Sequence, residues 1–289
     1  MPLDQDPVED SAEQEMSFLD HLEELRWHII RSAVALIVLT IFAFTQVTWI
    51  FNNIILAPAK KDFPTWRVMC QLGHAIGKPD LLCIEDIPLE LQSRFMTGQF
   101  TITIVAALVL GLVFSFPYIV WELWRFIKPG LRVRERRGTR GIVFAISSLF
   151  GSGIAFGFFV IAPLMVYVMV NYRISDMIKN EFDVTSYVST FVTLVLGSGL
   201  LFQLPVVIYF LTKMGLVSPT FLRKYRKHSI IVILIIAAII TPPDPMSQTL
   251  IFLPLYLLFE ISILISVRVE RRKKKEEAEE LLREQAEQG

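Results

Sequence analysis

The sequence is short of charge, of cysteine and of enzyme motifs. Only 19% of its 289 residues are charged, and it has two cysteines. Soluble domains usually carry about a quarter charged residues, so this composition argues against a soluble globular chain. The motifs H-E-x-x-H, G-x-S-x-G, Walker A and paired C-x-x-C do not occur. We therefore expect no enzyme activity, no metal and no cofactor, because no nucleophile–base or metal-ligand pattern is present.

What the sequence has instead is long uncharged runs. They are 32–59, 95–121, 141–172, 184–212, 229–243 and 245–267, the last interrupted only by Glu260. The first four exceed the roughly 20 apolar residues that a membrane-spanning helix needs. A membrane β-barrel is excluded, since its strands would alternate in hydropathy and be about half as long. The sequence predicts an all-α polytopic membrane protein with six transmembrane helices.

The last two runs predict unusually short helices. Run 229–243 reaches only about 22 Å as a helix, against about 30 Å of hydrocarbon. The sequence Thr241-Pro-Pro-Asp-Pro245 then forces a turn. This turn brings Asp244 and Gln248 toward the membrane interior.

Lys and Arg predict the orientation, because they gather in cytoplasmic loops. They crowd the loops 121–140 and 213–228 and the segment after 267, whereas 173–183 has two and 241–247 has none. We expect both termini in the cytoplasm. The predicted organisation is a disordered acidic tail (1–16), a transmembrane domain (17–268) and a charged cytoplasmic tail (269–289).

The loop 52–94, placed outside by this topology, holds both cysteines and four prolines. The prolines predict that long helices are absent there. Cys70 and Cys83 form a disulfide on the oxidising side or remain two buried thiols, and the sequence leaves both alternatives open.

The segment Ser17–Arg31 predicts an amphipathic helix that leads into the first span. Asp20, Glu24 and His28 fall on one face at helical spacing. Carboxylates placed in this way can receive a cationic partner, although a solvated polar face is the simpler interpretation. A shared metal on His21, Glu24 and His28 is disfavoured, since helical histidines near acids are usually ordinary.

Polar residues within the apolar runs are a second group of candidates, because such groups need partners in a membrane. Gln203 and Glu260 each interrupt a run, and helix-to-helix hydrogen bonding is the simplest role for either. The basic loop 121–140 contains Glu135 between Arg134 and Arg136. A local salt bridge and the bidentate binding of an incoming guanidinium are the alternatives for Glu135.

Four motifs together resemble the TatC family, the multispanning receptor subunit of the twin-arginine protein translocase. They are HLEELR at 21–26, FSFPYIVWELWRFIKPGL with ERR at 114–137, FQLP at 202–205, and TPPDPMSQTL with PLYLLFE at 241–260. The resemblance covers nearly everything from 16 to about 268. It implies a concave bundle of six helices with two short final helices.

The resemblance also implies a function without a nucleotide. The family binds signal peptides with two consecutive arginines on folded precursors, and the proton motive force drives transport across the bacterial inner membrane. The residues that match its recognition surface are Glu24, Glu135, Arg26, Phe126, Pro129 and Arg136. The residues that match intramembrane or partner contacts are Gln203, Asp244, Gln248 and Glu260. Implied partners are TatA-type and TatB-type single-span proteins, further copies in a multimeric receptor, and the lipid bilayer, with no nucleic acid.

One position departs from the family. The family often has Glu where this chain has Gln203, and Gln forms hydrogen bonds but does not titrate. A secondary transporter of a small solute or ion is the alternative function. It is disfavoured because the sequence has no evident internal repeat and few intramembrane charges.

Overall fold

A computed structural model describes residues 18–77, 83, 87–128, 141–172, 174–175, 177, 180–240 and 245–288. Nearly all of the ordered elements are helical. The helices are α1 (Phe18–Thr45), α2 (Val47–Ile50), α3 (Pro64–Ile76), α5 (Gly98–Ile127), α7 (Ile142–Phe156), α8 (Ala162–Asn171), α9 (Val184–Leu201), α10 (Leu204–Lys213), α11 (Pro219–Lys224), α12 (Arg226–Ile240) and α13 (Pro245–Gln288). Short π-helical or 3-10 turns, η1 (Phe51–Ile55), η2 (Ala57–Ala59) and η4 (Gly157–Ile161), connect some of them.

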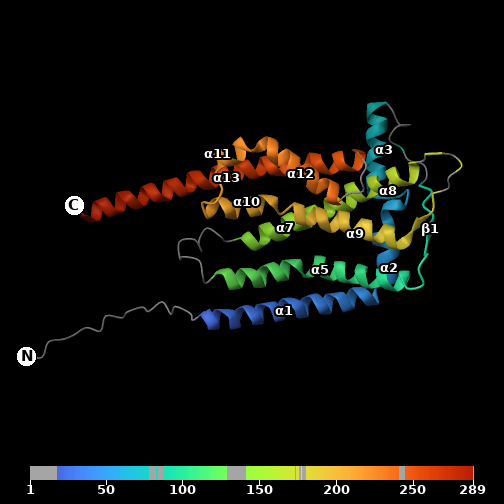
Figure 1. Cartoon of the computed structure of the whole chain (residues 1–289), viewed down its shortest axis with the longest axis horizontal. Helices are drawn as coiled ribbons and strands as arrows, with labels where there is room; N and C mark the ends of the chain where they lie inside the picture. Colours follow the sequence, from blue (N-terminus) through green and yellow to red (C-terminus); the bar gives the residue numbers. More distant parts are fainter. Residues whose placement is uncertain are drawn as a thin grey trace, which may run out of the picture.

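The long helices lie side by side in one bundle (Figure 1). Within the described residues, five helical stretches are long and apolar enough to cross a membrane: 23–45, 98–127, 142–171, 184–213 and 251–275. Two of these stretches are composite, since η4 joins α7 to α8 and α9 continues into α10 at Pro205. The prediction of a polytopic helical membrane protein is therefore confirmed.

Small residues bring the neighbouring helices into close contact. A Cβ atom on Gly111 of α5 would stand 2.9 Å from Thr40 Cα of α1. A Cβ atom on Gly153 of α7 would stand 2.8 Å from Gly199 Cα of α9. Helices in membranes associate through such backbone approaches, because water supplies no hydrophobic force between them.

The final two helices differ in length from the prediction. α12 has 15 residues, about 22 Å, as its short apolar run predicts. α13 has 44 residues, about 66 Å, so a short last helix is wrong for the element as a whole. Its apolar part ends near Val267, and the helix then continues through the segment 269–288, which was predicted to be a tail. The reason is local: Lys, Glu and Ala are strong helix formers, and pairs such as Lys274–Glu270 at 3.0 Å stabilise the exposed turns.

The end of the bundle where α1 stops is closed by an irregular cap. Strands β1 (Leu91–Gln92) and β2 (Phe182–Asp183) pair in parallel there. Helix α3 lies across this end rather than along the bundle (Figure 1). The expectation that prolines exclude long helices here was too strong, since Pro64 starts α3 in the first turn and Gly77 ends it at a φ of 75°.

Cys70 of α3 is joined to Cys83 by a disulfide, with Cα atoms 4.2 Å apart. This bond ties α3 to a cap that has few regular hydrogen bonds of its own. We predict that it forms in the purified protein. Non-reducing mass spectrometry should find the 70–83 cross-link, and the loop that it closes implies a loss of about 3 kcal/mol on reduction. Two alkylatable thiols would instead support the alternative of two buried thiols.

Candidate functional site

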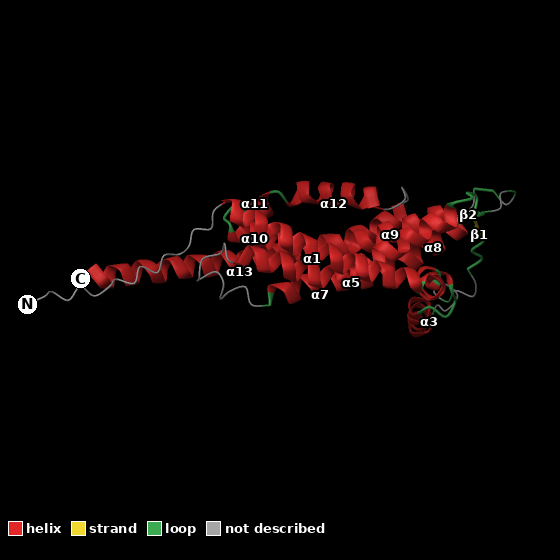
Figure 2. Ribbon diagram, turned by 90° about the horizontal axis from the view of Figure 1, so that it is seen from below, coloured by secondary structure: helices red, strands yellow, loops and turns green. Residues whose placement is uncertain are grey.

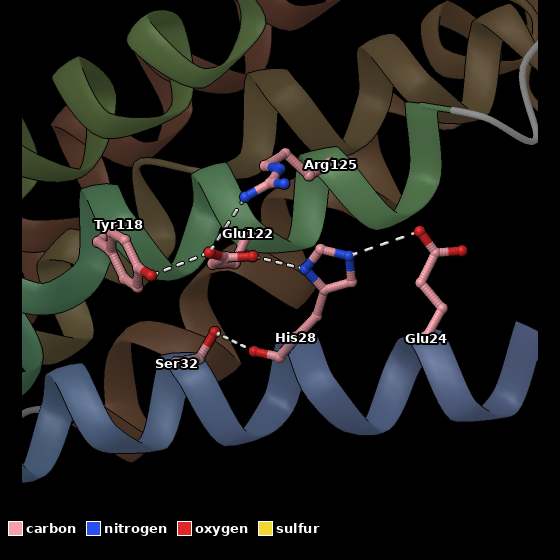
Figure 3. Close-up of polar contacts among 6 residues, drawn as sticks. All are labelled: Glu24, His28, Ser32, Tyr118, Glu122 and Arg125. Atoms are coloured by element: carbon pink, nitrogen blue, oxygen red, sulfur yellow. Dashed lines mark hydrogen bonds and ion pairs between the residues drawn. The ribbon is translucent and has the colours of Figure 1, made fainter.

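The candidate site lies at the bundle end opposite α3, where α1 begins and α5 ends. Helical spacing places Glu24, His28 and Ser32 on one face of α1, and Tyr118, Glu122 and Arg125 on the facing side of α5 (Figure 3). The α1 and α5 helices pack along their whole length. Side chains far apart in the sequence therefore meet between two rigid helices.

A buried histidine–carboxylate hydrogen bond is the centre of this site. His28 Nδ1 lies 2.5 Å from Glu122 Oε2, and the two residues are only 7% and 1% exposed. Because a carboxylate oxygen accepts, the proton lies on Nδ1 of His28. The second oxygen of Glu122 accepts from the Tyr118 hydroxyl at 2.9 Å and lies 3.6 Å from Arg125 Nη1. Both oxygens of the buried carboxylate are thus compensated, as burial of a charge requires.

Glu24 lies at the outer edge of this network. Its Oε1 is 3.9 Å from His28 Nε2. Its Oε2 is buried, and among the described residues none donates a hydrogen bond to it. A buried carboxylate oxygen without a donor is unfavourable, so Glu24 is suited to accept from an incoming cation.

The polar network borders an apolar hollow of about 270 Å³ between α1 and α5. Its walls include Leu25, Ile29, Leu123 and Phe126. The Phe126 ring meets the His28 ring edge-on, with centroids 6.1 Å apart. The low polarity of these walls strengthens the electrostatic interactions beside them.

Comparison with known proteins identifies the family. The family model "Sec-independent protein translocase protein (TatC)" matches residues 20–254. The chain belongs to the TatC family. It is 40% identical over 264 residues to TatC of Blattabacterium sp. subsp. Periplaneta americana, covering 91% of this chain and 99% of that protein. It is 31% identical to TatCy of Bacillus subtilis, covering 91% and 94%.

A solved structure agrees with this assignment. The crystal structure of the twin-arginine translocase receptor TatC matches with a TM-score of 0.67 and 29% identity, covering 86% of this chain and 99% of that one. The role of the chain is therefore that of the receptor in twin-arginine translocation, a protein-transport function in a bacterial membrane.

The structure describes only some of the residues that match the recognition surface of the TatC family. Glu24 and Phe126 both border the site. Arg26 points elsewhere, since its guanidinium pairs with Glu23 at 3.2 Å and lies 5.8 Å from the Trp27 ring centroid. Pro129, Glu135 and Arg136 lie outside the described residues. The pairing of Glu24 with Glu135 thus stays a prediction.

The intramembrane polar residues have mainly structural contacts. Gln203 Nε2 donates to the Ile146 carbonyl at 3.2 Å, while its Oε1 is buried without a donor among the described residues. Gln248 Nε2 donates to the Leu234 carbonyl at 3.3 Å and so links α13 to α12. Asp244 lies outside the described residues.

Glu260 of α13 forms a second ion pair. Its Oε2 accepts from Arg226 Nη2 at 2.8 Å, and its Oε1 accepts from the Tyr256 hydroxyl at 3.1 Å. Arg226 is the first residue of α12. The pair therefore fixes the start of the short helix against α13.

The sequence interpretation did not select His28 and Glu122 as a pair. Glu122 was assigned to a basic loop, whereas it lies in the last turns of α5. The spacing Tyr118, Glu122, Arg125 was the available signal, because it gathers a carboxylate and two donors on one helical face. The metal alternative with His21 stays untested, since the side chain of His21 lies outside the described residues.

Cys70, His74 and Cys83 also offer three ligand atoms within 4.8 Å of one another. Both sulfurs are used by the disulfide in this structure. A metal there would require both thiols to be reduced and deprotonated.

We predict strong coupling between His28 and Glu122. Glu122→Leu alone leaves His28 unpaired, and His28→Leu alone leaves a buried carboxylate that only Tyr118 and Arg125 contact. Each should lower stability by about 3–5 kcal/mol. The double variant restores an apolar interface and should recover much of this loss. Thermal unfolding of the purified protein in detergent measures all three.

The matched control is Glu23→Leu, which removes an exposed carboxylate that pairs with Arg26 among the residues that the structure describes. It should change stability by less than about 1 kcal/mol. Additive losses in the double variant would contradict the coupling.

Proposed function

We propose that Glu24 binds a guanidinium group of the signal peptide's arginine pair on folded precursor proteins. The observation that carries the proposal is the state of its carboxylate: one oxygen lies 3.9 Å from His28 Nε2, and the second oxygen is buried without a donor among the described residues. Arginine suits this position because its planar guanidinium offers several donors and keeps its charge. Lysine offers a more strongly hydrated point charge and fits less well.

Glu135 is proposed as the second carboxylate of the receptor. It belongs to the segment that follows the end of α5 at Ile127. Two adjacent arginines in an extended peptide direct their side chains apart, so two separated carboxylates suit them better than one. Phe126, Pro129 and Arg136 are proposed to border the peptide, and Arg26 would have to leave its contact with Glu23 to join them. The apolar wall at Phe126 would exclude part of the water from the contact.

We predict that Glu24→Gln and Glu135→Gln each weaken binding of a twin-arginine signal by roughly tenfold or more. The reason is the loss of a partly desolvated charge-assisted hydrogen bond, about 1.5–3 kcal/mol. Glutamine keeps the shape and removes the charge. Titration of a labelled signal peptide against receptor in nanodiscs measures the dissociation constants.

The controls separate recognition from folding. Glu23→Gln removes an exposed neighbouring carboxylate and should leave affinity unchanged. A twin-lysine signal should be affected little by either variant. Equal losses for both signals, or unchanged affinity for both, would contradict the proposal.

We infer that the signal-binding end faces the cytoplasm and that both termini lie there, in the inner membrane of a bacterium. The support is the Lys and Arg content of segments 121–140 and 213–228. In this arrangement the proposed six spans include α12 as the fifth, and the cap with α3 faces outward. The six helices form the concave bundle that the family resemblance implies.

Topology is testable with single cysteines in a variant whose native cysteines are replaced by serine. A cysteine at Thr139 should resist a membrane-impermeant thiol reagent in intact cells and react after lysis. A cysteine at Gln71, on α3, should react in intact cells. Labelling of position 139 from outside would overturn the orientation.

The proposed partners are TatA-type and TatB-type single-span proteins and further copies of the receptor in a multimeric complex. Gln203 supports a docking role, because its amide oxygen is buried without a described donor in the membrane region. Asp244, Gln248 and Glu260 are proposed as accessory polar contacts at α12 and α13. Transport is driven by the proton motive force, and Gln203 supplies a hydrogen bond rather than a titrating group.

A further inference from the structure

Helix α3 (Pro64–Ile76) lies crosswise to the bundle and extends beyond its outline. Figure 1 shows it perpendicular to the long helices, and Figure 2 shows it projecting from the side of the bundle. A crosswise helix at the end of membrane spans stands at the depth where hydrocarbon gives way to water.

One face of α3 is fixed to the protein. Trp66 is 2% exposed, and its Nε1 donates to the Pro58 carbonyl at 3.1 Å. Phe63, just before the helix, packs on Phe158 and Phe159 with ring centroids 5.4 and 5.8 Å away. With the Cys70–Cys83 bond, these contacts hold α3 in one orientation.

A second face is apolar and exposed. Val68, Leu72 and Ile76 occupy successive turns and are 55%, 52% and 67% exposed. At about 100° per residue, Arg67 and His74 lie on the far side of the helix, and Gln71 lies at the edge between that polar flank and Val68. The helix thus has a face packed on the protein, an exposed apolar face suited to lipid and a polar flank suited to water.

The apolar flank continues the lipid-facing surface of the bundle. The Thr65 hydroxyl donates to the carbonyl of Phe159, which lies within the membrane-spanning stretch 142–171. Phe159 is itself 42% exposed. Its position is about 26 Å from the start of that stretch, so α3 begins near the far edge of the hydrocarbon layer.

We propose that α3 is an interfacial helix whose flank of Val68, Leu72 and Ile76 lies in the lipid leaflet at this end of the bundle. Continuity with Phe159 and the opposition of apolar and polar flanks favour lipid over a second copy of the chain. The disulfide then preserves the angle at which the flank meets the membrane.

The test is the accessibility of spin labels in proteoliposomes. A genetically encoded ketone residue at 68, 72 or 76 carries the nitroxide and leaves the disulfide intact. Matched labels at 67 and 74 report the polar flank. The ratio of collision with oxygen to collision with a water-soluble nickel chelate should be severalfold higher at 68, 72 and 76.

Comparable chelate access on both flanks would overturn the proposal. So would exclusion of both reagents at 68, 72 and 76, which would indicate that another protein copy covers them. An independent measurement uses the unaltered chain: a photoactivatable lipid should label Val68, Leu72 or Ile76, detected by mass spectrometry. Labelling confined to the long helices would also overturn the proposal.

Discussion

A carboxylate buried between two membrane helices must be compensated by nearby donors or cations, and the end of the bundle where α1 begins depends on that constraint. Glu122 meets it with His28, Tyr118 and Arg125. Since His28 belongs to α1 and the others to α5, compensation fixes the two helices in register. Glu24, one turn before His28, therefore projects from a rigid frame at the edge of the bilayer.

The same end contains a second charged pair, Arg226 with Glu260, which is partly exposed. α12 is too short to cross the hydrocarbon alone and has few buried side chains. The ion pair at Arg226 is therefore an additional contact that attaches the start of α12 to α13. The opposite end is held differently, by the Cys70–Cys83 bond, the β1–β2 pair and aromatic contacts around Phe63.

The sequence predicted most of the architecture because charge segregation alone defines spans. It also predicted Glu24 as a candidate receptor group. It did not predict the His28–Glu122 pair, since these residues are 94 positions apart and only the packing of α1 on α5 relates them. It also underestimated one local helix signal, because Pro64 starts α3 instead of preventing it.

The two ends of the bundle are held by different kinds of contact, charged at the α1–α5 end and covalent or apolar at the α3 end. In the proposed binding mode, a guanidinium at Glu24 would add a cation beside the network in which His28 and Arg125 contact Glu122. His28 lies between the two carboxylates, 3.9 Å from Glu24 and 2.5 Å from Glu122, so a donor bound at Glu24 would compete with His28 for that carboxylate. The α3 end is held instead by a covalent bond and by apolar packing around Phe63. The proposed recognition site therefore belongs to the α1–α5 contact, whereas the disulfide-linked cap with α3 lies at the opposite end of the bundle.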